Sequence, residues 1–350
     1  MSTAQRRRVD KAKRLAYFDD AARYTPYLAT SAGGGLFLVK TEDKHIARSL
    51  FGKQSRGELA VLGRAAAAIR GLFGDQYASR SVLVDVGANI GTTTIPAVLS
   101  EGFSSAVAIE PEPENVRVLR LNVLLNSLED RITVLPVAAS HEVGESELVV
   151  TPDRGGKHWL AADPTKLDRK RSGRENETLT VKTVTLDHLV DTGVVDTERT
   201  GLLWIDAEAH EGHILAGASA LLEKGTPMVL EWNPSNLDRV GDRGRLQDAV
   251  VEHYTHFADM NRNPNPEQPT FPLQTADRLP AYAERFLNPM NVSSKTDILV
   301  LRLSYEQSAG IRSLDEVARL HCVSDEDEDP AGDELRLGRA RMLKRLLRRN

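Results

Sequence analysis

The sequence of 350 residues predicts an α/β fold in which helices cover both faces of a mostly parallel sheet. From Ser81 onward, short apolar runs alternate with segments of helical periodicity, which is typical of strand–helix–strand units. The apolar runs carry few polar positions, as in strands whose two faces are both covered by helices. Together these observations favour one layered sheet as the centre of the molecule.

The expected strands are the apolar runs Val82–Val86, Ala106–Ile109, Ile132–Val137, Leu202–Asp206, Met228–Trp232 and Asp297–Arg302. The expected helices between them are Thr93–Ser100, Pro113–Asn126, Gly212–Glu223 and Arg245–His253. Two extended segments, Ser146–Thr151 and Thr178–Thr183, flank a polar loop at Asp153–Glu177, and a long loop at Met260–Gln274 precedes the last strand.

The two ends of the chain differ in character from its centre. We expect a mainly helical N-terminal extension over residues 1–80, a core over residues 81–303, and a C-terminal helix and charged tail over residues 304–350. Within the ends, the expected elements are helices at Asp10–Arg23, Gly57–Phe73 and Ser313–Leu320 and a strand at Gly35–Lys40.

Composition excludes several classes of protein. No run approaches the roughly 18 apolar residues that a membrane helix needs, and no apolar region follows the basic N-terminus as in a secretory signal. The single cysteine, Cys322, excludes an internal disulfide and a cysteine-based zinc site. We therefore expect a cytoplasmic protein without a membrane span.

Charge argues against a general nucleic-acid binder, because the net charge is −5. The charge is uneven, with an acidic run at Asp325–Asp329 and an arginine-rich segment at Leu335–Asn350. We expect this segment to be solvated or packed within the molecule. The alternatives are that it binds a membrane surface, an acidic partner, nucleic acid or, in a homo-oligomer, a second subunit.

A glycine-containing turn follows the first strand of the core, in the segment VDVGANIG. Asp85 ends the strand, and Gly87 and Gly91 flank Asn89. Glycine allows a backbone to approach a ligand closely and to adopt positive φ, and the amides that follow favour an anionic group. Glu110 ends the next strand at the same edge of the sheet, where its carboxylate could accept hydrogen bonds from two ribose hydroxyls. These features predict a nucleotide-type cofactor.

Five blocks of sequence give a more specific resemblance. VDVGANIG, IEPEPENVRVLRLNVLLN, LPVAAS, VKTVTLDHL and LLWIDAEAHEGHILAGASALL resemble, in this order, the FkbM-type methyltransferase family. The resemblance covers roughly Ser81 to Asn233. It implies a class I, Rossmann-like methyltransferase with a mostly parallel seven-stranded sheet. It also implies S-adenosyl-L-methionine as the methyl donor and a hydroxyl oxygen, often of a sugar or a polyketide-type natural product, as the acceptor.

The resemblance assigns roles to residues of the cofactor site. Asp85, Gly87, Asn89 and Gly91 would hold the methionine end of the cofactor, Glu110 would take the ribose, and Ala138 and Ala139 would lie near the adenine. The chain departs from the family in the fourth-strand block. Trp204 stands where the family has a lysine, and Ala209 stands where it has a glycine.

Methyl transfer to an alcohol needs alignment and a group that takes the hydroxyl proton. Asp206, Glu208 and His210 follow the fourth strand, and alternation along an extended chain would place them on one face. His210 has the ordinary pKa best suited to a base near neutrality. The alternatives are that His210 and His213 are surface residues at a helix start and that Asp206 contacts the cofactor's amino group. The acids could also hold a divalent cation, but their spacing is not diagnostic and we expect no metal.

Two residues are candidates for acceptor binding. Glu231 ends the fifth strand, and Trp159, beside His158, lies in the polar loop, where an indole could stack on a sugar. A buried strand-end acid and an anchor for the loop are the alternative interpretations. Asn233 and Pro234 follow the fifth strand and not the fourth, which disfavours methylation of nitrogen.

The sequence therefore predicts an oxygen methyltransferase for a small hydroxyl-rich molecule. One alternative is a catalytically idle, cofactor-binding scaffold. Another is a methyltransferase that reaches nucleic acid through its basic tail. A nicotinamide-dependent oxidoreductase is disfavoured, because the third glycine of the dinucleotide pattern is missing.

Overall fold

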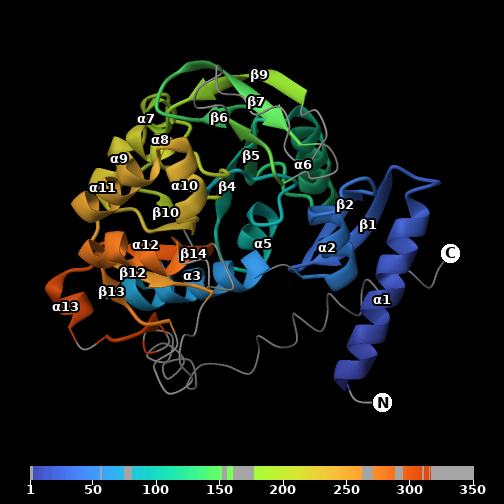
Figure 1. Ribbon diagram of the computed structural model, residues 1–350, viewed down its shortest axis with the longest axis horizontal. Helices are drawn as coiled ribbons and strands as arrows, with labels where there is room; N and C mark the ends of the chain where they lie inside the picture. Colours follow the sequence, from blue (N-terminus) through green and yellow to red (C-terminus); the bar gives the residue numbers. More distant parts are fainter. Residues whose placement is uncertain are drawn as a thin grey trace.

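The computed structural model describes residues 3–55, 57–74, 81–151, 156–160, 177–261, 271–287, 295–309, 311–314 and 316. Cys322, the acidic run at Asp325–Asp329, the segment Leu335–Asn350 and most of the helix expected at Ser313–Leu320 lie outside these residues. Figure 1 shows a layered α/β molecule with a central sheet, a smaller sheet near one edge of it and an N-terminal segment at its side.

The central sheet has the strand order β13-β12-β14-β11-β10-β3-β4-β5. Its members are β3 (Val82–Val86), β4 (Ser105–Ile109), β5 (Ile132–Leu135), β10 (Thr200–Ile205), β11 (Met228–Trp232), β12 (His256–Asp259), β13 (Gln274–Thr275) and β14 (Thr296–Leu301). Neighbours from β5 to β11 are parallel, whereas β14 runs antiparallel to both β11 and β12. The six expected strands are present. The short, half-polar β12 was not expected, and β13 adds a two-residue edge to a sheet of seven.

Helices cover both faces of this sheet because successive strand residues point to opposite sides. Leu83 and Trp204 belong to one apolar cluster, which also contains the buried faces of α3 (Gly57–Phe73), α5 (Thr94–Leu99) and α6 (Pro113–Leu125). Val84 and Leu203 belong to the other. The helices of this second face are α7 (Leu186–Asp191), α8 (Glu211–Ala216), α9 (Ser219–Lys224), α10 (Pro234–Val240), α11 (Arg243–His253) and α12 (Leu279–Leu287).

The N-terminal segment contains a hairpin as well as helices. After α1 (Thr3–Ala21), β1 (Tyr27–Ala32) and β2 (Gly35–Lys40) pair antiparallel, and α2 (Ile46–Lys53) leads to α3. The expected strand is β2, whereas β1 and α2 were not expected. Asn122 and Asn126 of α6 fasten β2, because their side-chain oxygens accept the backbone N–H groups of Leu38 at 2.6 Å and Leu36 at 2.8 Å.

The smaller sheet has the order β6-β9-β7-β8. It comprises β6 (Ala138–Ala139), β7 (Gly144–Val150), β8 (Trp159–Leu160) and β9 (Glu177–Val184), so both expected extended segments are strands. Trp159 and Leu160 pair with β7, whereas the sequence suggested that they lie in a loop. This pairing holds a segment that is far from the glycine turn in sequence within the smaller sheet, whose strands β6, β7 and β9 are labelled in Figure 1.

Beyond these sheets, the described residues include the short helices η2 (Ala276–Arg278) and α13 (Tyr305–Ser308). No helix within the described ranges is long and apolar enough to cross a membrane.

Candidate active site

A cleft of about 1040 Å³, including its opening to solvent, lies where β3, β4 and β10 end. Parallel strands whose carboxyl ends meet at one edge of a sheet commonly form such a crevice. Cofactor and acceptor candidates share its wall, including Gly87, Glu110, Ala139, Trp159 and Asp206. The remaining candidates in the wall are Asn89, Ala138, Glu208 and His210.

The glycine turn forms one side of the cleft. Gly87 has φ +85°, and a Cβ there would lie 2.0 Å from the carbonyl oxygen of Asp206, so only glycine lets β3 and β10 approach so closely. Asn89, at φ +51°, lines the cleft beside it. Gly91 lies behind the turn, where a Cβ would be 2.8 Å from Leu119 Cδ1. Gly91 therefore shapes the turn and is not part of the cleft wall.

Asp85 is also behind the wall. It is 1% exposed and accepts a short hydrogen bond from the hydroxyl of Thr94 in α5. Burial raises the pKa of Asp85 to about 7, although the Thr94 hydroxyl acts in the opposite direction. This carboxyl group ties the end of β3 to α5, and any effect on a cofactor would pass through the turn.

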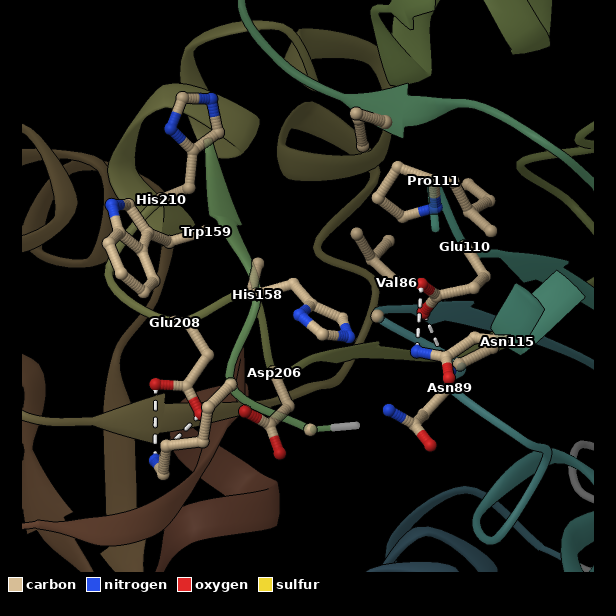
Figure 2. Close-up of a pocket in the computed structure, with 18 of the residues that line it drawn as sticks. Val86, Asn89, Glu110, Pro111, Asn115, His158, Trp159, Asp206, Glu208 and His210 are labelled. Carbon is tan, nitrogen blue, oxygen red and sulfur yellow. Dashed lines mark hydrogen bonds and ion pairs between the residues drawn. The ribbon is translucent and has the colours of Figure 1, made fainter. Parts of the chain in front are cut away.

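Glu110 faces the cleft with a carboxyl group that is held on both oxygens. Oε2 accepts the backbone N–H of Asn89 at 2.9 Å, and Oε1 accepts the backbone N–H of Glu112 at 3.0 Å and the side-chain amide of Asn115 at 3.4 Å (Figure 2). Burial raises the pKa of Glu110 to about 7, and these hydrogen bonds oppose the shift. Two carboxylate oxygens offer about four acceptor positions, so capacity remains for a hydroxyl.

The wall beyond Glu110 is apolar. Ala138 and Ala139 form β6 and are both buried, and Leu148 of β7 and Leu160 of β8, which share an apolar cluster with Ala138, also line the cleft. Small alanine side chains leave room for a flat ring, and Trp159 adds an aromatic surface from β8.

The loop after β10 brings the expected catalytic residues together. Glu208 and Ala209 have φ +49° and +76°, left-handed values that a side chain makes costly. Glu211 supports them, because its Oε1 accepts the N–H groups of Ala207 at 3.1 Å and Ala209 at 3.3 Å. The loop therefore has the backbone shape that a glycine at position 209 would adopt most easily. Asp206, at its start, faces the cleft (Figure 2).

Glu208 is paired across the cleft. Lys157 Nζ lies 2.9 Å from Glu208 Oε1. This ion pair links the segment that precedes β8 to the loop after β10. Burial and the neighbouring Asp206 raise the pKa of Glu208, whereas Lys157 opposes that change.

His210 is buried, at 6% exposure, and not a surface residue. Its Nε2 lies 2.9 Å from the Ser140 hydroxyl, and its ring stacks on that of His213 with centroids 4.5 Å apart. Burial, together with a smaller contribution from His213, lowers the pKa of His210 to about 3. His213 in turn pairs with Asp242 at 2.8 Å. His210 is thus a neutral, hydrogen-bonded side chain and a weak base.

A second cavity of about 1250 Å³ lies next to the cleft, and Asp206 lines both. Glu231 lines the second cavity at 4% exposure and forms a close ion pair with Lys295. Burial raises the pKa of Glu231, and Lys295 opposes the shift. The wall is polar and comes from both ends of the chain. It includes His45, Ser49, Lys53, Glu58, Lys157, Asn261 and Asp297.

The sequence did not indicate a role for Lys157, Lys295 or Asp297, and it placed His158 only as a neighbour of Trp159 in the polar loop. One signal was available for Lys295 and Asp297, because β14 is antiparallel and its beginning lies at the edge where the parallel strands end. Residues at the start of such a strand are therefore also candidates. No group of three or more histidine, cysteine or acidic side chains in the described residues has an arrangement suited to a metal ion.

The strand order, with an antiparallel β14 inserted between β11 and β12 and a cleft at the ends of β3 and β4, defines a class I methyltransferase fold. The sequence model of the methyltransferase FkbM domain matches residues 85–265. The chain belongs to the FkbM methyltransferase family.

Solved structures with similar folds are distant in sequence. Methyltransferase FkbM from Methylobacillus flagellatus KT is 16% identical, with 64% of this chain and 44% of that chain covered and a TM-score of 0.36. This chain thus spans less than half of that protein.

For two further structures, the match covers a larger share of the other chain. Precorrin-6y C5,15-methyltransferase from Geobacter metallireducens GS-15 is 14% identical, with coverages of 68% and 88% and a TM-score of 0.32. The O-methyltransferase from Bacillus cereus, solved in complex with SAH, is 14% identical, with coverages of 69% and 80% and a TM-score of 0.30. No curated protein sequence matches the chain.

Proposed function

We propose that the protein transfers a methyl group from S-adenosyl-L-methionine to a hydroxyl oxygen of a small, hydroxyl-rich molecule. The observation that carries this proposal is the position of Asp206, which lines both the cleft and the second cavity, as do His45, Glu58, Lys157 and Lys295. A group at this junction can act on an acceptor in one cavity and a donor in the other.

The cleft suits the proposed cofactor. Glu110 offers a carboxylate for the ribose hydroxyls, Ala138 and Ala139 leave space for the adenine, and Gly87 and Asn89 border the part assigned to the methionine end. When bound, the sulfonium supplies a methyl group to an oxygen aligned opposite the sulfur. The methyl group would pass from the sulfur to the acceptor oxygen, with S-adenosylhomocysteine as the product.

The acceptor proton needs a base, and we propose Asp206 for this role. His210 is disfavoured, because its Nε2 is engaged by Ser140 and burial lowers its pKa to about 3. Glu208 is held in its ion pair with Lys157. Asp206 would take the hydroxyl proton as the new O–C bond forms, since an ether oxygen cannot keep it.

The second cavity is the proposed acceptor site. Glu231, Asp297 and Asn261 offer acceptors and donors that match hydroxyl groups, and Lys295 balances part of the negative charge. Trp159 lines the cleft and not the second cavity, so we propose that it contacts the cofactor or the acceptor group nearest to the methyl.

Transfer of a labelled methyl group from S-adenosyl-L-methionine tests the proposal. A panel of sugars, polyols and polyketide-type alcohols is incubated with the wild type and with Asp206→Asn. We expect one acceptor class to be labelled at an oxygen and the variant to lose about a hundredfold or more in rate, with S-adenosylhomocysteine binding retained.

Other outcomes identify the alternatives. Cofactor binding without transfer to any acceptor would favour a catalytically idle scaffold. Transfer to nucleic acid with a steep salt dependence would favour the basic tail as a binding element. Either result contradicts a small hydroxyl acceptor.

A further inference from the structure

His158 enters the cleft from the segment that precedes β8, far in sequence from the glycine turn. Figure 2 shows its ring in the middle of the cleft, between Glu208 on one side and Glu110 and Asn89 on the other. This position gives it access to a ligand, and neither the family motif nor the proposed proton transfer uses it.

One hydrogen bond fixes which ring nitrogen carries the proton. The backbone N–H of Thr151 donates to His158 Nδ1 at 3.2 Å. A nitrogen that accepts a hydrogen bond has no proton of its own, so in the neutral ring the proton must be on Nε2. Burial lowers the pKa of His158 to about 4; Asp43 opposes the shift and Lys40 adds to it, so the ring is neutral near pH 7.

A neutral imidazole with this tautomer has one free function, which is to donate a hydrogen bond through Nε2. It cannot take a proton from an acceptor hydroxyl, because its accepting nitrogen is already engaged by Thr151. The ligand atom that it meets should therefore be an oxygen that accepts.

The backbone around His158 is held against the cofactor side of the cleft. A Cβ at Gly156 would lie 2.2 Å from Ile46 Cδ1 of α2 and 3.8 Å from the side-chain nitrogen of Asn89. The segment is thus packed between α2 and the glycine turn, and β8 pairs with β7 just beyond it. This packing limits how far the imidazole can move.

We infer that His158 is a positioning residue whose Nε2–H donates a hydrogen bond to the carboxylate of the cofactor's methionine end. This inference rests on the proposed use of S-adenosyl-L-methionine. A carboxylate is the bound group that most needs donors here, because the cleft has four acidic side chains, those of Glu58, Glu110, Asp206 and Glu208. Its two lysines, Lys157 and Lys295, are already paired with Glu208 and Glu231. The ribose hydroxyls, by contrast, can donate to Glu110.

Two ligands and two variants test the assignment. S-adenosylhomocysteine carries the amino-acid carboxylate, whereas 5′-methylthioadenosine keeps the nucleoside and the sulfur but lacks it. His158→Phe removes the donor and keeps a flat ring, and His158→Gln keeps an N–H near the position of Nε2. Binding of both ligands to each full-length protein is measured by isothermal titration calorimetry.

We expect His158→Phe to weaken S-adenosylhomocysteine binding about tenfold, as for one lost hydrogen bond to a charged group. Binding of 5′-methylthioadenosine should stay within about twofold of the wild type, because the ligand lacks the affected group. His158→Gln should recover most of the affinity for S-adenosylhomocysteine. Nitrogen-15 spectra of the wild type should show the imidazole protonated on Nε2 at pH 7.

Equal weakening of both ligands in His158→Phe would mean a structural role and overturn the assignment, as would no weakening of either. A proton on Nδ1 would also overturn it. If the wild type binds neither ligand, the proposed function itself fails, so the two failures can be told apart.

Discussion

Asp85 and Glu110 are two acids of similar burial that have different surroundings. Glu110 faces the cleft, whereas Asp85 faces Thr94 in the interior. The family resemblance assigned both to the cofactor site. Asp85 lies inside β3, in register with Ala108, whereas Glu110 follows the last residue of β4 and therefore lies two positions further toward the cleft. The positions of Gly87, Asn89 and Glu110 were predictable from the motif, whereas those of Lys157, His158 and Lys295 depend on packing between distant segments.

The raised pKa of Asp85, about 7 in the folded protein, predicts a pH effect on stability. Between its ordinary pKa near 4 and about 7, the folded state binds more protons at this group than the unfolded state does. This contribution to the free energy of unfolding therefore falls as pH rises through that window and is constant above it. Asp85→Asn lacks the effect, so its free energy of unfolding should rise relative to the wild type from about pH 4 to about pH 7.

Urea unfolding of both proteins at several pH values measures this difference, because other titrating groups cancel in the comparison. Glu129→Gln, at an exposed acid, is a matched control and should show no such trend. A difference that is flat or falls with pH would mean that Asp85 is ionised throughout.

At the scale of elements, the alternation of apolar runs was enough to predict the strands that have two covered faces. The alternation did not predict the strands β12, β8 and β1. β12 is half polar, β8 has only two residues, and β1 has only two large apolar residues, Tyr27 and Leu28, so none of them carries a clear local strand signal. The side chains of Asn122 and Asn126 in α6 form hydrogen bonds with the backbone of β2, in the place of those that another strand would form.

Asn122 links that hairpin to the cofactor turn. Besides accepting from Leu38, its side-chain amide donates to the carbonyl oxygen of Ile90 at 2.9 Å, and the residue is fully buried. Asn122→Leu leaves these groups without partners, so we expect a loss of about 2–4 kcal/mol in the free energy of unfolding. Asn126→Leu, whose hydrogen bonds lie at the exposed end of the hairpin, should cost about 1 kcal/mol.

Chemical denaturation compares the two variants, and S-adenosylhomocysteine binding adds a second measurement. Only Asn122→Leu should weaken binding, because only Asn122 contacts the turn through Ile90. If both variants lose the same free energy of unfolding, the loss comes from the hairpin contacts and not from the contact of Asn122 with the turn.

At the scale of the whole molecule, the second cavity combines residues from α2, the start of α3, the loop after β10, β11 and the start of β14. The fold class and most strands of the core were predictable because the alternation and the motifs lie within one continuous stretch. The residues that line this cavity were not predictable, because they depend on how the N-terminal segment and the last strand pack against each other. The division into residues 1–80, 81–303 and 304–350 stays a proposal.

In the wall of this cavity, the Lys295–Glu231 ion pair links β11 to the residue that precedes β14. Glu231 is buried while Lys295 is about half exposed, so solvent screens part of the interaction and we expect Lys295→Met to cost about 1–2 kcal/mol. The pKa of Glu231 should rise further in this variant because its counter-charge is gone. In a double-mutant cycle, Glu231→Gln should remove most of the cost of Lys295→Met. Additive costs, measured by denaturant unfolding, would mean that the pair contributes nothing.

We expect the cleft beside Glu110 to bind S-adenosyl-L-methionine and its product. Isothermal titration with S-adenosylhomocysteine, on the wild type and on Glu110→Gln, measures this binding. The pKa of Glu110 is about 7, and ribose hydroxyls donate to the ionised carboxylate. We therefore predict saturable one-to-one binding that strengthens as pH rises through about 7, and a variant that binds about tenfold more weakly without this pH dependence. Absence of binding by the wild type, or binding that Glu110→Gln leaves unchanged, would contradict the account.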